Sequence, residues 1–144
     1  MISDTVPRMG AATLSLKGTE TILVAEDEDG VRSLTREVLE KYGYRVLEAA
    51  NGEEALVVAD QHQGPVDVLL SDVVMPRMGG PELAQALLTR RPALKVLYMS
   101  GYTEEAIAKH GILDPGTSFL EKPFSPDTLA RRIRDLLDSG GPAA

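Results

Sequence analysis

Four short apolar runs along the chain each end on a side chain that can handle phosphate or a hard metal ion. The runs occupy residues 21–25, 66–70, 94–99 and 117–120. Continuous runs of Val, Leu and Ile of this length are typical of strands that are buried on both faces, as in a parallel sheet covered by helices. A shorter stretch at residues 44–48 predicts one more strand, which would be the second along the chain.

Helical patterns separate these strands. The first helix is expected to present one apolar face and to stop at Gly43. That face comprises Val31, Leu34, Val38, Leu39 and Tyr42. Asn51 and Ser125 are typical N-caps for the second and the last helix, and two further helices are expected at residues 80–90 and 103–109.

Strand and helix alternate strictly along the chain, with five of each. This alternation favours right-handed βαβ crossovers and a three-layer α/β sandwich. In such sheets ligands bind outside the carboxyl ends of the strands. The residues at those ends include Glu26, Asp27, Asp72, Ser100 and Lys122. The pattern therefore predicts three carboxylates, a hydroxyl and an ammonium at one edge of one sheet, where they would form a site.

Composition narrows the functional classes. The 144 residues suit one domain, and 15 Lys+Arg against 22 Asp+Glu give a net charge of −7, without the basic footprint of a nucleic-acid binder. Cysteine is absent, which excludes thiolate metal sites and fits a cytoplasmic location. No apolar stretch approaches the roughly 20 residues of a bilayer span, so no membrane contact is expected. The domain is expected at residues 20–139, between a flexible linker or tail at 1–19 and a short tail at 140–144.

The acidic run at residues 26–29 has two interpretations. Charge runs are usually solvated, so a plain acidic loop is the first. Two of these acids follow a buried strand, however, where like charges repel each other, and a divalent cation would remove the repulsion. Mg²⁺ is typically held by one or two carboxylates plus phosphate oxygens. Asp72 would join the acidic pair if its strand is a neighbour, with Lys122 as the balancing cation, and Pro123 would fix the backbone there, with a cis peptide bond as one option.

Four motifs carry a resemblance to a known family. They lie at residues 22–28, 69–76, 99–102 and 121–124, in this order and each at the end of an expected strand. With these motifs the chain resembles the receiver domain of two-component response regulators, most of all the C-terminal receivers of hybrid sensor histidine kinases. The resemblance implies a flavodoxin-like (βα)5 fold with a parallel five-stranded sheet of order 2-1-3-4-5, and a role in phosphorelay signal transduction.

The resemblance also implies roles for single residues, position by position. Asp72 would be phosphorylated by a histidine kinase or a histidine phosphotransfer domain, in cis or in trans, to an aspartyl phosphate. Glu26 and Asp27 would hold Mg²⁺ together with Asp72 and the backbone carbonyl of Val74. Because Glu stands first in the pair where Asp is commoner, Glu26 is expected to reach the metal through water. The chain would be a phosphoacceptor rather than an enzyme, and would catalyse only its own phosphorylation and dephosphorylation.

Further implied roles surround the phosphoryl group. Ser100 and Lys122 would hold the phosphoryl oxygens. Ser100 would also form a switch with Phe119, which stands at the aromatic switch position of the family. Val74 and Tyr102 would flank the path along which water reaches the acyl phosphate and would set its lifetime.

Other functions share parts of this pattern. The receiver could act mainly as a phosphate sink or as an autoregulatory module of a hybrid kinase. A Mg²⁺-dependent aspartyl-phosphate phosphohydrolase would share Asp72 and Lys122, but it normally needs a second acid where Val74 stands. A flavodoxin-type cofactor binder needs a hydroxyl- and glycine-rich phosphate loop in place of the acidic run. On the receiver interpretation, the expected partners are the histidine kinase or phosphotransfer domain that donates the phosphoryl group. A second copy of the chain, in a weak homodimer, is a further possible partner.

Overall fold

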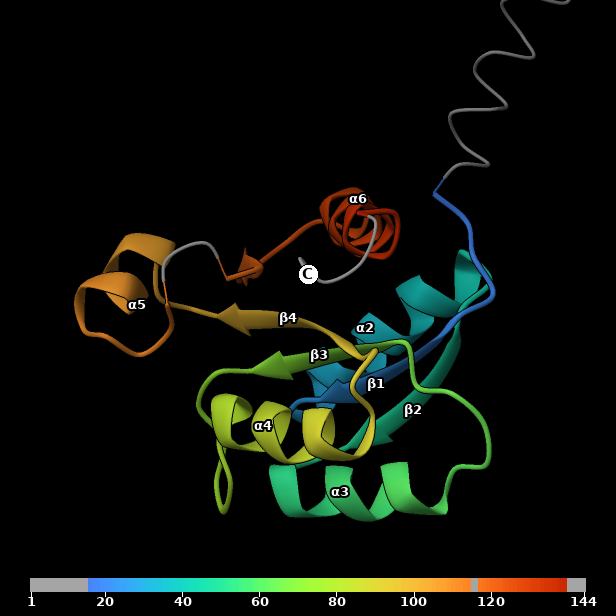
Figure 1. Cartoon of the computed structure of the whole chain (residues 1–144). Coiled ribbons are helices and arrows are strands. Elements are labelled where there is room, and N and C mark those ends of the chain that lie inside the picture. The colour runs from blue at the N-terminus through green and yellow to red at the C-terminus, as the bar shows by residue number, and fades with distance from the viewer. Residues whose placement is uncertain (1–15, 115–116, 140–144) are drawn as a thin grey trace, which may run out of the picture.

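The fold is built on one sheet of five parallel strands in the order β2-β1-β3-β4-β5. The computed structural model describes residues 16–114 and 117–139, and Figure 1 shows their arrangement. The strands are β1 (Thr21–Ala25), β2 (Arg45–Ala49), β3 (Val68–Asp72), β4 (Lys95–Ser100) and β5 (Phe119–Glu121). The flavodoxin-like strand order implied by the resemblance is confirmed.

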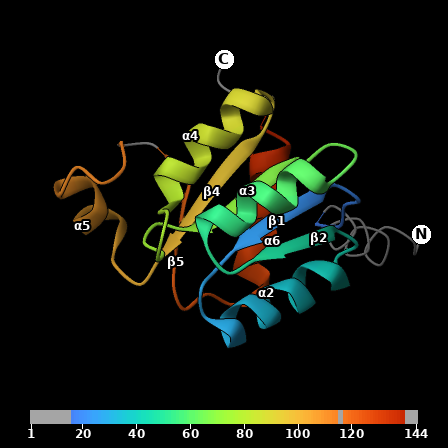
Figure 2. The same ribbon diagram turned by 90° about the horizontal axis from the view of Figure 1, so that it is seen from below.

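Five helices cover this sheet within the described residues. They are α2 (Asp29–Lys41), α3 (Gly52–Gln61), α4 (Gly80–Arg90), α5 (Glu104–Lys109) and α6 (Pro126–Leu137). Helices α2 and α6 lie on one face and α3 and α4 on the other, while α5 lies beyond β4 at the end of the sheet (Figure 1 and Figure 2). The predicted three-layer sandwich is confirmed. None of these five helices is long and apolar enough to cross a membrane.

Each helical layer has its own apolar core. Successive side chains of a strand point to opposite faces of the sheet, so strands covered on both sides must be apolar throughout. On the side of α3 and α4, Leu23 and Leu69 pack with Leu83 and Leu87. On the side of α2 and α6 the core includes Ile22, Val24, Leu70, Met99, Leu39 and Ile133. This two-sided burial explains why the strand runs lack the alternation of apolar and polar residues seen in half-exposed strands.

Capping residues mark the starts of α3 and α6 and the end of α2, as the sequence predicts. The Asn51 side chain accepts a hydrogen bond from the Glu54 N–H at 2.8 Å, where α3 begins. Ser125 Oγ accepts one from the Thr128 N–H at 3.1 Å, where α6 begins. Both bonds satisfy N–H groups that have no partner inside the helix. Gly43 follows α2 with φ of +100°, a left-handed conformation that favours glycine, so this stop is also confirmed.

The boundaries of the third strand differ from the prediction. β3 begins at Val68 rather than at residue 66, and the Asp67 side chain just before it accepts a hydrogen bond from the Thr21 N–H at 2.8 Å. The strand also continues to Asp72, two residues beyond the end of the predicted apolar run.

The predicted apolar face of α2 is wrong at one position. Leu34 is 61% exposed, and the neighbouring Thr35 is buried instead. Thr35 can be buried because its Oγ1 donates a hydrogen bond to the Val31 carbonyl at 2.7 Å, which satisfies its hydroxyl within the helix. The spacing of apolar residues carries no information on this local bond, so it predicted burial of Leu34 instead.

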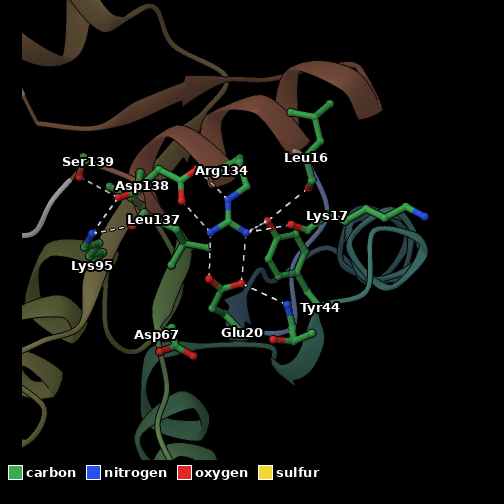
Figure 3. A network of polar contacts seen from close by, with 12 residues as sticks. Leu16, Lys17, Glu20, Tyr44, Asp67, Lys95, Arg134, Leu137, Asp138 and Ser139 are labelled. Carbon is green, nitrogen blue, oxygen red and sulfur yellow. Dashed lines mark hydrogen bonds and ion pairs between the residues drawn. The ribbon is translucent and has the colours of Figure 1, made fainter. Parts of the chain in front are cut away.

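A segment before the first strand is tied to the last helix through Arg134, as Figure 3 shows. Arg134 Nη2 donates to Glu20 Oε2 at 2.9 Å, and Nη1 donates to the Lys17 carbonyl at 3.0 Å and to the Tyr44 hydroxyl at 3.2 Å. Residues 16–19 therefore contact the domain. The rest of the predicted tail at 1–19, and the predicted tail at 140–144, lie outside the described residues.

We predict that Arg134→Met, which keeps the aliphatic stem, lowers the free energy of unfolding by about 2 kcal/mol, the usual scale for hydrogen bonds to charged groups. Urea unfolding at neutral pH measures the loss. The matched control is Arg131→Met on the same helix, which removes one exposed ion pair with Asp127 and should leave stability unchanged.

The hydrogen bond from Arg134 lowers the pKa of Glu20 below its ordinary value, against the smaller opposing effect of burial. A lowered carboxyl pKa stabilises the fold above the unfolded-state value, about 4.3, and this contribution disappears as the pH falls through the folded-state value. The stability gap between the wild type and Arg134→Met should therefore shrink below about pH 4. A gap that is the same at pH 7 and pH 3 would contradict this account.

Candidate functional site

The carboxylate of Glu26 is fully buried directly after β1. Its Oε1 accepts a hydrogen bond from Lys122 Nζ at 2.9 Å, and its Oε2 accepts one from the Glu28 N–H at 3.0 Å. Both carboxylate oxygens therefore have a donor from the protein itself. This arrangement is consistent with a contact to a metal through water, as the sequence suggested.

Asp72 is nearly as deeply buried as Glu26, at the end of the neighbouring strand. Ala25 pairs with Ser71 across β1 and β3, so the two acids follow side by side. Lys122 Nζ lies 2.7 Å from Asp72 Oδ1, but outside hydrogen-bond geometry. Among the described residues the buried Oδ1 therefore has an ion-pair partner and no hydrogen bond.

The environment separates the pKa values of the two buried carboxyl groups. Burial, followed by the contact with Glu26, raises the pKa of Asp72 to about 8. Burial acts in the same direction on Glu26, but contacts with Asp72 and Lys122 outweigh it and hold the pKa of Glu26 below its usual range. Burial also opposes the charge on Lys122, yet its two carboxyl neighbours raise the pKa of the ammonium. The pair therefore resists a second negative charge in the absence of another cation.

Asp27 adds a third carboxylate on the solvent side. One oxygen each from Glu26, Asp27 and Asp72 lies within 4.8 Å of the others. Asp27 is exposed while the other two acids are buried, so a cation could reach the group from solvent. Hard carboxylate oxygens are the ligands that Mg²⁺ and Ca²⁺ prefer. The acidic cluster predicted from the sequence is therefore assembled, and its donor atoms suit a metal ion.

A cavity of about 210 Å³ opens beside the acids. Its lining includes six of the predicted site residues: Asp27, Asp72, Val74, Ser100, Tyr102 and Lys122. Ser100 Oγ accepts a hydrogen bond from the Tyr102 N–H at 3.0 Å, which leaves the hydroxyl hydrogen free to donate. Val74 and Tyr102 are 70% and 65% exposed, so both side chains stand at the rim of the cavity.

Phe119 lies apart from this cavity. It is buried on β5 beside a small void of about 20 Å³, which Ile107 and Leu113 also line. Its backbone pairs with Tyr98, two residues before Ser100 on the adjacent strand. The two predicted switch residues are therefore on neighbouring strands, but they line different cavities, and the coupling between them stays a proposal.

Gly80 supports the site, although its role was not expected from the sequence. A Cβ at this first residue of α4 would collide with the Asp72 carbonyl oxygen. Ser71 Oγ donates to the same carbonyl at 2.9 Å, and the Gly80 N–H donates to the Val73 carbonyl at 2.9 Å. Helix α4 therefore begins directly on the backbone that carries Asp72. The doublet of Gly79 and Gly80 was the available signal, because glycines often mark a close approach of two backbones.

Comparison with known families decides the class of protein. The sequence profile of the response regulator receiver domain matches residues 22–134, which is most of the chain. The chain belongs to the response regulator receiver family. Receiver domains are signalling modules of two-component systems, and they interact with histidine kinases or phosphotransfer proteins. The recognition made from the four sequence motifs is confirmed.

Individual relatives agree with this family. The receiver is 43% identical over 123 residues to the sensor kinase CckA of Brucella abortus, an alignment that covers 85% of this chain and 13% of that protein. The crystal structure of the receiver domain from the hybrid histidine kinase CckA superposes with a TM-score of 0.69 and 41% identity, over 82% of this chain and 99% of the other. The chain thus spans a small part of CckA and nearly the whole of its receiver domain.

A second similar structure was solved with ligands. It is the response regulator TrrA of Thermotoga maritima in complex with Mg²⁺-BeF. It has a TM-score of 0.68 and 29% identity, over 83% of this receiver and the whole of the other chain.

We predict that Gly80→Ala lowers the free energy of unfolding by about 1–3 kcal/mol, the usual penalty for an overpacked contact. Gly30→Ala is the matched control, because Gly30 also lies in the first turn of a helix and a Cβ there meets no atom within 4 Å. The control should be neutral or stabilising by up to about 1 kcal/mol, since alanine favours helix. Thermal unfolding of both variants measures the difference. Equal stability of the two would show that the junction of β3 and α4 relaxes freely.

Proposed function

We propose that this receiver accepts a phosphoryl group on Asp72, from the phosphohistidine of a histidine kinase or a histidine phosphotransfer domain. The observation that carries the proposal is the setting of the Asp72 side chain. It is buried between Glu26 and Lys122 and lines the cavity of about 210 Å³ that solvent can reach. A carboxylate in this setting can act as a nucleophile only towards a group that enters that cavity.

The proposed transfer is a displacement at phosphorus. An Asp72 carboxylate oxygen attacks the phosphorus, the O–P bond forms as the P–N bond breaks, and the imidazole leaves with the electron pair. Lys122 stays beside Asp72 and offsets the negative charge there, while the Ser100 hydroxyl can donate to a phosphoryl oxygen in the cavity. The chain supplies one nucleophile and several positioned charges, so its chemistry is limited to forming and losing its own aspartyl phosphate.

We further propose that the metal is Mg²⁺. Asp27 and Asp72 would hold it with the Val74 backbone carbonyl, and Glu26 would act through water. The observations in favour are the three carboxylate oxygens within 4.8 Å of one another and the exposure of Asp27, which lets a cation reach the group from solvent. When bound, Mg²⁺ would neutralise charge on the phosphoryl oxygens. The Mg²⁺-BeF complex of TrrA supports this choice by similarity.

The position of the receiver in its pathway is a second part of the proposal. A phosphodonor must come from a separate protein or from another part of the same protein, and the similarity to CckA favours a kinase of the hybrid type. The phosphohydrolase alternative is not favoured, because Val74 stands where that class needs an acid and the family match is to receivers. A cytoplasmic location remains part of this proposal.

We predict that Asp72→Asn abolishes the incorporation of label from a ³²P-labelled acyl phosphate, because an amide cannot form the acyl phosphate. Chelation of divalent cations should abolish labelling of the wild type as well. Asp60→Asn is the matched control, since Asp60 is an exposed acid on α3 whose one ion-pair partner among the described residues is Arg90, and it should label normally. Acid-labile labelling of Asp72→Asn, or full labelling in excess chelator, would refute the corresponding part of the proposal.

The lifetime of the aspartyl phosphate gives a further prediction. Val74 cannot orient water, and Tyr102 can cover the phosphoryl group from the rim of the cavity, so spontaneous hydrolysis should be slow. Val74→Asn and Tyr102→Ala should each accelerate it, and positioning effects of this kind reach roughly a hundredfold. Decay of isolated phosphoprotein measures the rates. Val57→Asn, at an exposed valine on α3 remote from the site, is the control and should decay at the wild-type rate, whereas unchanged rates in both rim variants would contradict the prediction.

A further inference from the structure

The side chain of Arg32 turns back from the first turn of α2 towards the acidic loop. Its Nη1 donates to the backbone carbonyl of Glu26 at 2.8 Å, and its Nη2 donates to Asp29 Oδ1 at 2.6 Å. The side chain is only 17% exposed. Arg32 therefore makes two directed contacts, one on each side of Asp27 along the chain.

A second element holds the guanidinium in this orientation. Arg32 Nε lies 3.5 Å from Glu48 Oε1, on the neighbouring strand β2. The other oxygen of Glu48 accepts a hydrogen bond from Arg36 Nη1 at 2.8 Å. Because the guanidinium is planar and its donors have fixed directions, contacts on three sides leave it little freedom to turn. Strand β2 thus braces the group that holds the Glu26 carbonyl.

These contacts bear on the peptide that carries Asp27. The carbonyl of Glu26 belongs to the peptide unit that joins Glu26 to Asp27, so a bond to its oxygen fixes the plane from which the Asp27 backbone departs. On the other side, the Arg32 backbone N–H donates to the Glu28 carbonyl at 2.9 Å. Residue 32 therefore contacts the main chain on both sides of the exposed acid, through the arginine side chain before it and through an ordinary helical backbone bond after it. The direction of the Asp27 carboxylate depends on this local backbone, because the side chain lies in solvent rather than in the core.

We propose that Arg32 is a positioning residue for the metal site, which holds the Asp27 backbone so that its carboxylate meets those of Glu26 and Asp72. The inference rests on the proposed function of the acidic cluster as a Mg²⁺ site. Arg32 would act through the backbone of Asp27, without a direct contact to the cation or the phosphoryl group. The signal in the sequence is its spacing, five residues after Asp27, which returns the side chain over the N-terminal turn of α2.

The sign of the expected effect separates positioning from simple charge. The positive charge of Arg32, taken alone, repels Mg²⁺, so its removal would strengthen binding if charge were its main contribution. Loss of a positioning contact would instead weaken binding, and partners outside the direct ligands of a metal typically contribute about 10–100-fold to affinity. The two effects oppose each other, and the proposal requires that positioning dominates.

The test is a Mg²⁺ titration of the 144-residue chain, followed by amide chemical shifts. The chain contains no tryptophan, so the amides around the site are more direct reporters than intrinsic fluorescence. Arg32→Ala is expected to raise the Kd for Mg²⁺ about tenfold or more. Arg32→Lys keeps the charge but loses the planar fork, and it should also raise the Kd. The same spectra show whether each variant is folded.

Arg36→Ala is the matched control. Arg36 lies on the same helix as Arg32 and also contacts Glu48. Among the described residues it makes no hydrogen bond to Glu26 or Asp29, whereas Arg32 bonds to both. The Kd of this variant for Mg²⁺ should change far less than that of Arg32→Ala, because the contacts of Arg32 to Glu26, Asp29 and Glu48 remain.

Equal or tighter binding by Arg32→Ala would overturn the proposal, as would wild-type binding by Arg32→Lys. The same weakening in Arg36→Ala would assign the effect to the packing of α2 on β2, and would also overturn it. If the wild type itself shows no Mg²⁺-dependent shifts, the proposed metal site fails, and that result is distinguishable from the failure of Arg32 alone.

Discussion

Two buried carboxyl groups meet one largely buried ammonium at the carboxyl edge of the sheet, and the rest of the domain is arranged around this contact. Lys122 Nζ lies 2.9 Å from Glu26 Oε1 and 2.7 Å from Asp72 Oδ1. A buried charge without a partner is strongly unfavourable, so neither acid could be ionised here without the lysine. Lys122 follows β5, whereas the acids lie at the ends of β1 and β3, and the contact forms only when the strand order brings these ends to one edge. The topology and the electrostatics of the site therefore depend on each other.

A buried ion pair of this kind adds little net stability, because the loss of hydration of its charges offsets their mutual attraction. Apolar residues of similar volume often replace a buried ion pair without loss of stability, so its presence indicates function more than folding. The effect on the pKa values supports that view, because burial and the contact with Glu26 raise the pKa of Asp72 to about 8. A cation bound next to Asp72 would favour the ionised carboxylate and would therefore lower this raised pKa. The exposed carboxylate of Asp27 stands on the side from which such a cation would arrive.

The sheet and the acidic edge could be predicted from the sequence because both follow from rules of short range. Apolar runs mark the buried strands, and the residue after each run falls at the carboxyl edge whatever the helices contribute. The burial of Thr35 rather than Leu34 on α2 could not be predicted in this way, because it depends on a single hydrogen bond of the threonine hydroxyl. The roles of Gly80 and Arg32 could not be predicted for a different reason. Their contacts join an element to a backbone oxygen in another segment, and a side chain's target among backbone atoms has no signature in composition or period.

Two sets of ionic contacts, those of Lys122 at one end of β1 and those of Arg134 at the other, bear on how the domain can respond to a change of charge. Under the proposed function, phosphorylation adds roughly two negative charges at the carboxyl edge. At the opposite end of β1, Arg134 ties the incoming segment to α6 through Glu20. Strand β1 lies between these two points, and it is buried and paired on both sides, so it cannot bend without breaking both ladders. The site residues with the most exposed side chains are instead Val74 and Tyr102, in the loops that follow β3 and β4. The least restrained parts of the site are thus the parts nearest to the added charge, and a partner that distinguishes the two states would have to read them there or on the helices that they precede.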